Sequence, residues 1–325
     1  MITLDRFILE EERHHPGATG ELSMLLMRFG VAGKRIAWEL AVGGLKSLLG
    51  STGGTNVQGE DQKKLDALAN DILLETFDYG GLVSVAASEE MEKIVVFPRA
   101  TENGRYAVLF DPMDGSSNIA VNGTLGTIFS IRPRGGGREE DLLRSGREQV
   151  AAGYILFGPA TLLVYTSGPE VRLFTLEPSI GEFLLTSASV RMPPRGRAYA
   201  VNEGRSGGWT PETAAFVDHL KRDGRPYSTR YSGSLVGDFH RILLEGGIYL
   251  YPAAAGKSSG KLRVLYECHP LALVAENAGG AATTGAEKVL DVVPDSLHAR
   301  VPFAIGSAEE VALYDRYARG QPNQA

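Results

Sequence analysis

Seven short β-rich runs follow one another between residues 82 and 186, and they restrict the fold more than any other feature of the chain. Most of these runs are bounded by Gly, Pro or Ser, which is the pattern of strands separated by turns. A charged, glycine-rich stretch at residues 133–149 interrupts them and predicts a surface loop. We expect a central sheet built from residues 82–86, 106–110, 127–131, 153–157, 161–165, 171–176 and 182–186.

Helical periodicity flanks this predicted sheet on both sides. Apolar residues at helical spacing predict a long amphipathic helix within residues 20–49 and a second helix over 65–76. After residue 197 strand-like and helix-like segments alternate, with strands expected at 199–203, 247–253, 288–293 and 302–307 and helices at 234–245 and 271–278. Ser307 and Glu310 have the spacing of a capping box for the last helix.

The 325 residues, 43% of them hydrophobic, are enough for one large or two moderate domains. We predict a layered α/β fold in two domains, 1–190 and 191–325, in which layers of helix and sheet alternate. A formal net charge of -6 excludes a broad basic field for nucleic acid or an anionic membrane. The single cysteine, Cys268, and a charged first segment without a signal-peptide core favour a cytoplasmic location.

The sharpest chemical signal is the segment DPMDGSSN at residues 111–118, directly after an apolar run. A strand that ends in a Pro-containing turn can project Asp111 and Asp114 toward one point, with the Met113 carbonyl between them. Hard cations such as Mg²⁺ prefer such an all-oxygen set, and the following Gly-Ser-Ser lets backbone amides approach a phosphate. The alternative is an ordinary tight turn, because Asp, Pro and Gly dominate turns.

A metal site requires further acids, and the chain supplies them. Glu89 and Glu90 follow the run 82–86, although a bare pair of glutamates is also typical of a solvated surface. Glu60 and Asp66 lie near the second predicted helix, and Glu267 lies in GKLRVLYE. Acids gathered in one site raise one another's pKa values unless cations fill the space between them.

Seven segments together resemble class I fructose-1,6-bisphosphatase in content and order, from about Thr19 to Ser307. The motif DPxDGSSN alone marks a wider superfamily of lithium-sensitive, metal-dependent phosphatases that includes inositol monophosphatases. The sequence has no WDxAAG-like segment of the inositol branch. The segments are GTNVQGEDQKKLD, SEE, FDPMDGSSN, NEG, RYSGSLVGDFHR, GGIYLYPA and GKLRVLYECHP.

The resemblance implies a sugar-phosphatase fold and a role for each matching residue. Two or three Mg²⁺ ions per site, with Mn²⁺ as a possible substitute, are expected on Glu89, Asp111, the Met113 carbonyl, Asp114 and Glu267. Glu90 is expected to serve an additional metal or to activate water, and Glu60 and Asp66 are expected to prepare the nucleophilic water. The expected substrate-binding residues are Gly115, Ser116 and Ser117 at the reacting phosphate, Asn202, Arg230, Tyr231 and Tyr251 at the distal phosphate, and Lys261 and Arg263 at the sugar and the reacting side.

The implied activity is hydrolysis of the 1-phosphate of D-fructose 1,6-bisphosphate, in gluconeogenesis or the Calvin cycle. Arg230 reaches into a neighbouring subunit's site in the family, so a homo-oligomer, by resemblance a homotetramer, is expected. A sedoheptulose-1,7-bisphosphatase or a dual-specificity enzyme remains open, because it would use the same metals. A catalytically silent regulatory protein on this fold is the alternative of another class, and the intact acids weigh against it.

The resemblance also concerns an effector. In AMP-inhibited relatives the nucleotide pocket uses the start of the first long helix, a Lys-Tyr pair and an Arg at the end of the strand after DGSSN. Thr19, Glu21 and Tyr106 match this pattern, Arg105 replaces the Lys, and the strand-end Arg falls on Pro133. Proline offers neither a charge nor a donor. Arg132 and Arg134 flank it, but neighbouring strand residues point to opposite faces, so neither arginine substitutes automatically. We therefore expect weak or absent inhibition by AMP.

Overall fold

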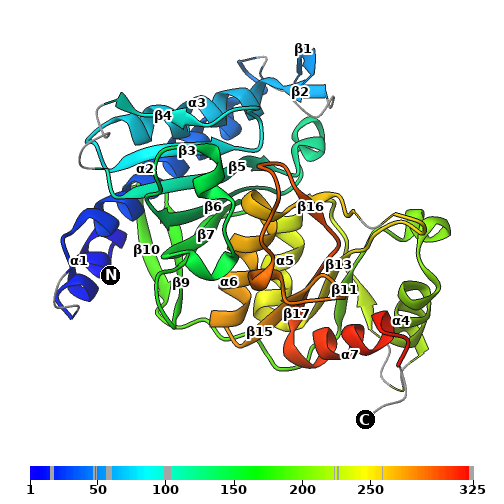
Figure 1. Cartoon of the computed structure of the whole chain (residues 1–325). Coiled ribbons are helices and arrows are strands. Elements are labelled where there is room, and N and C mark those ends of the chain that lie inside the picture. Colours follow the sequence, from blue (N-terminus) through cyan, green and yellow to red (C-terminus); the bar gives the residue numbers. More distant parts are fainter. Residues whose placement is uncertain are drawn as a thin grey trace.

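Helix and sheet layers alternate through the molecule (Figure 1). The computed structural model describes residues 1–14, 18–46, 48, 50–55, 61–98, 104–222, 224, 227–257 and 259–321. Its main components are an 8-stranded sheet, a 5-stranded sheet and helices that cover and separate them. The predicted α/β layered architecture is therefore confirmed.

The 8-stranded sheet has the order β10-β9-β8-β7-β6-β5-β3-β4. Strands β3 and β5 run parallel, whereas the other neighbouring pairs are antiparallel. The carboxyl ends of β3 and β5 therefore lie at the same edge of the sheet. The strands are β3 (Val83–Ser88), β4 (Val95–Val96), β5 (Tyr106–Asp114), β6 (Leu125–Pro133), β7 (Ala151–Phe157), β8 (Thr161–Thr166), β9 (Val171–Glu177) and β10 (Glu182–Ser187).

Three N-terminal helices pack on one face of this sheet: α1 (Leu4–Glu12), α2 (Glu21–Val42) and α3 (Lys64–Asp78). The apolar stripe of α2 is buried, and Phe29 stacks on Phe129 of β6 with ring centroids 3.9 Å apart. A Cβ added at Gly33 of α2 would lie 2.7 Å from Cδ1 of Ile155, so helix and sheet approach too closely there for a larger residue. A small sheet of β1 (Ser51–Thr55) and β2 (Asp61–Lys63) precedes α3.

Helices α5 (Leu235–Glu245) and α6 (His269–Asn277) lie between the two large sheets, as Figure 1 shows. Their buried apolar residues join both sheets into one core. Helices α4 (Pro211–Arg222) and α7 (Ala308–Ala318) cover the outer face of the second sheet. That sheet has the order β12 (Ser228–Thr229), β11 (Ala198–Ala200), β13 (Gly247–Tyr251), β17 (Phe303–Ser307) and β15 (Gly280–Thr283), and a small sheet pairs β14 (Leu262–Arg263) with β16 (Arg300–Val301).

Some local predictions are wrong. Residues 288–293 form no strand, because Val289 and Leu290 bury their side chains from a single 3-10 turn, Val289–Asp291. Ser307 and Glu310 form no capping box: Ser307 Oγ donates to the Pro193 carbonyl at 2.6 Å, and a Glu310 carboxylate oxygen accepts from the Gly196 amide at 3.0 Å. Helix α1 was not predicted. No helix in the described ranges combines the length and apolar character that a bilayer crossing requires.

Candidate active site

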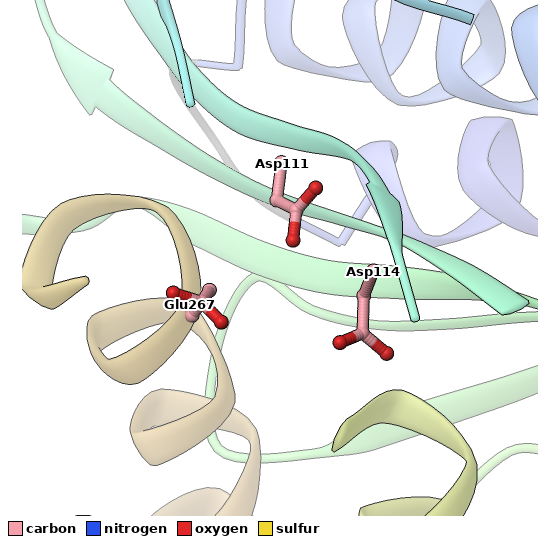
Figure 2. A group of neighbouring side chains, drawn as sticks. All are labelled: Asp111, Asp114 and Glu267. Carbon is pink, nitrogen blue, oxygen red and sulfur yellow. The ribbon is translucent and has the colours of Figure 1, made fainter. Parts of the chain in front are cut away.

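Three buried carboxylates meet at the edge of the 8-stranded sheet. Asp111 and Asp114 lie at the end of β5, and Glu267 lies in the π-helical turn Val264–Cys268 that leads into α6. One oxygen from each can be chosen so that all lie within 4.8 Å of one another, and Figure 2 shows the two aspartates extending from the strand beside the helical turn of Glu267. The residues are only 4%, 8% and 5% exposed.

An irregularity in β5 brings the two aspartates to the same side. In a regular strand, residues three apart point to opposite faces. The β5–β6 register shifts between Asp111 and Asp114, and the Met113 amide donates to Asp111 Oδ1 at 2.9 Å. The strand thus continues through the motif to Asp114, whereas the sequence predicted a turn after the strand. The bulge, and not a turn, therefore directs the side chains of Asp111 and Asp114 to the same side.

The Asp114 carboxylate is held by the first turn of α5. Ser234 Oγ donates to it at 2.8 Å, and the amides of Leu235 and Val236 donate at 3.2 and 2.8 Å. Ser234 Oγ also accepts from the Gly237 amide at 3.1 Å and so caps α5. The sequence predicted this helix but not its contact with the carboxylate cluster.

Glu89 joins the cluster because β3 runs parallel to β5. Its amide donates to the Phe110 carbonyl at 3.0 Å, which places Glu89 beside Asp111. Arg263 forms an ion pair with the Glu89 carboxylate, and its amide donates to Glu267 Oε2 at 2.6 Å. The guanidinium of Arg263, predicted to contact the sugar and the reacting side, lies against the Glu89 carboxylate in this structure.

Burial and mutual repulsion disfavour the ionised forms of these acids. Burial raises the pKa of Asp111 well above its ordinary value, and the nearby charges of Glu89 and Glu267 raise it further. Burial, with Glu89 adding to it, raises the pKa of Glu267 to about 8. The pKa values of Glu89 and Asp114 are also raised, mainly by burial. Carboxylate oxygens gathered in this way fit a hard divalent cation, whose charge would remove the repulsion.

Asp66 and Glu90 lie close to the cluster. Asp66, at the start of α3, is 4% exposed and accepts from the Lys63 amide at 3.3 Å. Burial, with the charge of Glu90 adding to it, raises the pKa of Asp66 to about 8. Glu60, the third residue predicted to prepare the water, lies outside the described residues.

One cavity of about 610 Å³ connects the cluster with most of the predicted substrate-binding residues. Arg230 does not line this cavity; its Nη1 donates to the carbonyl of Thr229 at 2.9 Å. The predicted residues that do line it are Asp66, Glu89, Glu90, Asp111, Met113, Asp114, Gly115, Ser116, Ser117, Asn202, Tyr231, Tyr251, Lys261, Arg263 and Glu267.

The Gly-Ser-Ser segment leads into a short 3-10 helix, Ser116–Val121, and not into an α-helix. Gly115 has a φ of 78°, and a Cβ there would lie 2.9 Å from the Cβ of Ser234. Glycine is therefore required both by the backbone conformation and by the approach of the segment before α5. This close packing brings the segment to the cavity wall.

Arg205 and Lys63 also line the cavity, but neither was selected from the sequence. Arg205 follows the NEG motif directly, and this position could have identified it as a cavity residue from the sequence. Lys63 and Lys64 have the sequence pattern of an exposed helix face, which gives no reason to select Lys63. Lys63 could have been placed in the cavity only if the position of nearby Asp66 beside the carboxylate cluster had been known.

The residues of the effector pattern lie near the start of α2 and β5. Arg105 Nε lies 3.1 Å from Glu21 Oε2, and Thr19 Oγ1 donates to the same carboxylate at 3.1 Å. Pro133 is paired with Tyr106 across β5 and β6. The proline thus occupies the position at which the pattern has an arginine.

The preceding Arg132 cannot replace that arginine, because its side chain points into the interior. Arg132 is 2% exposed, and its Nη1 donates to the carbonyls of Arg144 and Ser145 at 3.0 and 3.2 Å. Its Nη2 lies 2.8 Å from Nδ1 of His269. Neighbouring strand residues alternate between faces, so Arg132 and Pro133 diverge.

We therefore expect AMP to inhibit turnover weakly or not at all, since a nucleotide phosphate would lack its bidentate partner. Steady-state assays across a range of AMP concentrations measure this. Strong inhibition at low AMP that is lost on substitution of Thr19 or Arg105 would show that the pocket is functional in this chain.

Comparisons with known proteins agree with this geometry. Two family models, "Fructose-1-6-bisphosphatase, N-terminal domain" and "Fructose-1-6-bisphosphatase, C-terminal domain", match residues 2–188 and 192–319. The chain is 47% identical over 324 residues to a class 1 fructose-1,6-bisphosphatase of Trichodesmium erythraeum, covering 98% of this chain and 91% of the relative. It is 45% identical over 330 residues to one of Chlorobium phaeobacteroides strain BS1, covering 99% of both chains.

The fold is also that of a solved relative. The crystal structure of Leishmania major fructose-1,6-bisphosphatase in holo form superposes with a TM-score of 0.91 at 37% identity, covering 98% of each chain. Similarity thus extends over nearly the whole length in both sequence and structure. The chain belongs to the class 1 fructose-1,6-bisphosphatase family.

Proposed function

We propose that this chain is a phosphoric monoester hydrolase that converts D-fructose 1,6-bisphosphate and water to fructose 6-phosphate and phosphate. The observation that carries the proposal is the cavity of about 610 Å³, which joins a buried carboxylate cluster to a group of hydrogen-bond donors. One phosphate of a bisphosphate would lie at the carboxylate cluster, and the other would bind to the hydrogen-bond donors. Family membership and the full-length relatives support the same reaction.

We infer that Mg²⁺, at two or three sites, or Mn²⁺ occupies the carboxylate cluster. Glu89, Asp111, Asp114, Glu267 and the carbonyl of Met113 would hold it, since a buried set of oxygen ligands suits a hard cation. When bound, the metal supplies a lowered water pKa and polarises the phosphoryl oxygens. The amides of residues 115–117 would orient the reacting phosphate at the cavity wall.

Asp66 and Glu90 are proposed to receive the proton of the attacking water. Both line the cavity, and the raised pKa of Asp66 makes its deprotonated carboxylate a stronger base than an ordinary aspartate. Glu60 is proposed for the same task on the resemblance alone.

Two features of organisation are also proposals. A domain boundary at 190/191 is supported by the limits of the two family-model matches, residues 2–188 and 192–319. A homo-oligomer, by resemblance a homotetramer, is supported by the position of Arg230, which lies outside the cavity of its own chain. We assign the activity to gluconeogenesis or the Calvin cycle.

Phosphate release from a panel of sugar bisphosphates and monophosphates, measured with and without Mg²⁺, tests the proposed reaction. We expect Mg²⁺-dependent release from fructose 1,6-bisphosphate. Faster turnover of sedoheptulose 1,7-bisphosphate would favour the alternative substrate. No release from any bisphosphate would favour a catalytically silent regulatory protein.

Arg230→Ala is expected to raise KM for the bisphosphate far more than it weakens metal binding. The physical reason is the loss of a charge-assisted, fork-shaped contact to the distal phosphate of a neighbouring subunit. Arg241→Ala is the matched control, because Arg241 lies on the same segment, pairs with Glu245 and does not line the cavity. An unchanged KM in Arg230→Ala would contradict the assigned contact.

A further inference from the structure

Two cavities of the molecule share a wall. The first contains the carboxylate cluster, and the second, of about 460 Å³, is lined by none of those carboxylates. The shared residues therefore mark the end of the first cavity that lies away from the cluster. They are Asn202, Arg205, Tyr251 and Lys261.

Arg205 is presented at this end by a braced turn. It lies in the 3-10 helix Glu203–Gly208, which follows β11, and its amide donates to the Asn202 carbonyl at 3.0 Å. Tyr199 Oη donates to Glu203 at 2.5 Å, and Lys221 pairs with the same carboxylate. The only acid of the turn, Glu203, thus has partners other than Arg205. Glu203 therefore does not compete for the Arg205 guanidinium, and Arg205 lines the cavity.

The guanidinium of Arg205 is available to an anion. In the part of the chain that the structure describes, Arg205 has no ion pair, and its Nη1 donates to Tyr251 Oη at 3.4 Å. Arg263, the other arginine that lines the first cavity, is already paired with Glu89. Arg230 does not line the cavity of its own chain. Among the described residues, Arg205 is the one arginine that lines both cavities.

Resting on the proposed function, we propose that Arg205 binds the distal phosphate of the sugar bisphosphate within its own subunit. A planar guanidinium offers two parallel N–H donors to phosphate oxygens, and Tyr251, its present partner, would orient it for this contact. The distal phosphate would then be recognised by a charge from the same chain and not only through a neighbouring subunit. Arg205 is a specificity-determining residue, since it distinguishes a bisphosphate from a monophosphate.

The test uses the full chain with Mg²⁺ and two substrates, fructose 1,6-bisphosphate and fructose 1-phosphate, which lacks the distal phosphate. Arg205→Ala is expected to raise KM for the bisphosphate roughly tenfold or more, as the loss of a charge-assisted contact does, and to change kcat by less than about twofold. KM for fructose 1-phosphate should not change. Arg205→Lys should give an intermediate KM, because it keeps the charge but loses the fork.

Calorimetric titration of fructose 6-phosphate into the metal-free protein provides a second readout that needs no turnover. Its affinity should fall in Arg205→Ala by a factor similar to the rise in KM. Arg222→Ala is the control, because Arg222 is an exposed arginine of α4 that pairs with Asp218. It should leave both quantities unchanged.

An unchanged KM for the bisphosphate, or equal changes for both substrates, would overturn the assignment of Arg205 while leaving the proposed reaction intact. If the unaltered chain fails to hydrolyse the bisphosphate, the proposed reaction fails instead. The fructose 6-phosphate titration then still decides whether Arg205 binds a sugar phosphate: unchanged affinity in Arg205→Ala overturns the inference, and weakened affinity supports it.

Discussion

Asp111→Asn and Glu89→Gln are each expected to lower Mg²⁺-dependent turnover by about two to three orders of magnitude, with little change in fold. Both replacements keep the size of the side chain and remove one negative charge from the proposed metal site. Asp111 lies in β5 and Glu89 directly follows the parallel strand β3, so both losses act at the same sheet edge. The measurement is kcat at saturating Mg²⁺.

Two further measurements separate a lost ligand from a damaged fold. Circular dichroism of both metal-free variants should match that of the unaltered chain. Thermal unfolding of Asp111→Asn should match or exceed it, because a buried acid that repels its neighbours has been removed. Glu89→Gln should unfold at a lower temperature, because it leaves the buried guanidinium of Arg263 without its carboxylate partner. Calorimetric titration with Mn²⁺ should show weakened binding. Glu92→Gln is the matched control, since Glu92 is exposed in the same loop and does not line the cavity. Near-normal turnover in both ligand variants would refute the assignment.

The metal-free protein is expected to lose stability as the pH rises from about 4 to about 8. The raised pKa values of Asp66 and Glu267, both about 8, mean that the folded state keeps protons in this range that the unfolded state has released. A folded state that binds more protons than the unfolded state becomes less stable with rising pH. Divalent cations bind the deprotonated carboxylates and should reverse the loss.

Thermal unfolding with and without Mg²⁺ at pH 5 and pH 8 measures this effect. The increase in Tm on adding Mg²⁺ should be larger at pH 8, by about 5 °C, which corresponds to roughly 2 to 3 kcal/mol in a chain of this size. Glu267→Gln should reduce the pH dependence of the metal-free protein, whereas Asp218→Asn, an exposed carboxylate of α4, should not. A Tm increment that is equal at both pH values would contradict the proposed charge clustering.

Apolar patterns among residues close together in the sequence predicted most of the helices and strands. The predicted apolar runs form β5 to β10, of which β5, β6 and β7 are almost entirely buried, and the helical stripe of α2 packs into the core where its spacing indicated. The segment 288–293 failed because an apolar run of that length is also compatible with a turn that buries the same side chains. Helix α1 does carry apolar residues at helical spacing, Leu4, Phe7 and Ile8, but the pattern covers only nine residues and was missed.

The site was predictable as a set of residues but not as a geometry. DPMDGSSN indicated acids at a strand end, yet three-residue spacing gives a common direction only with the bulge in β5, which no local pattern reveals. The hydrogen bonds from Ser234 and Val236 to Asp114 join positions far apart in the chain. The pairing of Arg263 with Glu89 likewise depends on packing between distant segments.

The hydrogen bonds from the first turn of α5 to the Asp114 carboxylate have a thermodynamic consequence. Residues 231–236 include Ser234 and Val236, which donate hydrogen bonds to Asp114. They also include Tyr231, which lines the cavity where the distal phosphate is proposed to bind. One short stretch of backbone thus contacts both a cation ligand and the sugar-phosphate pocket. If substrate binding shifts this stretch, cation affinity changes by some factor, and reciprocity requires that the cation change substrate affinity by the same factor. In that case the first turn of α5 would couple cation binding to substrate binding.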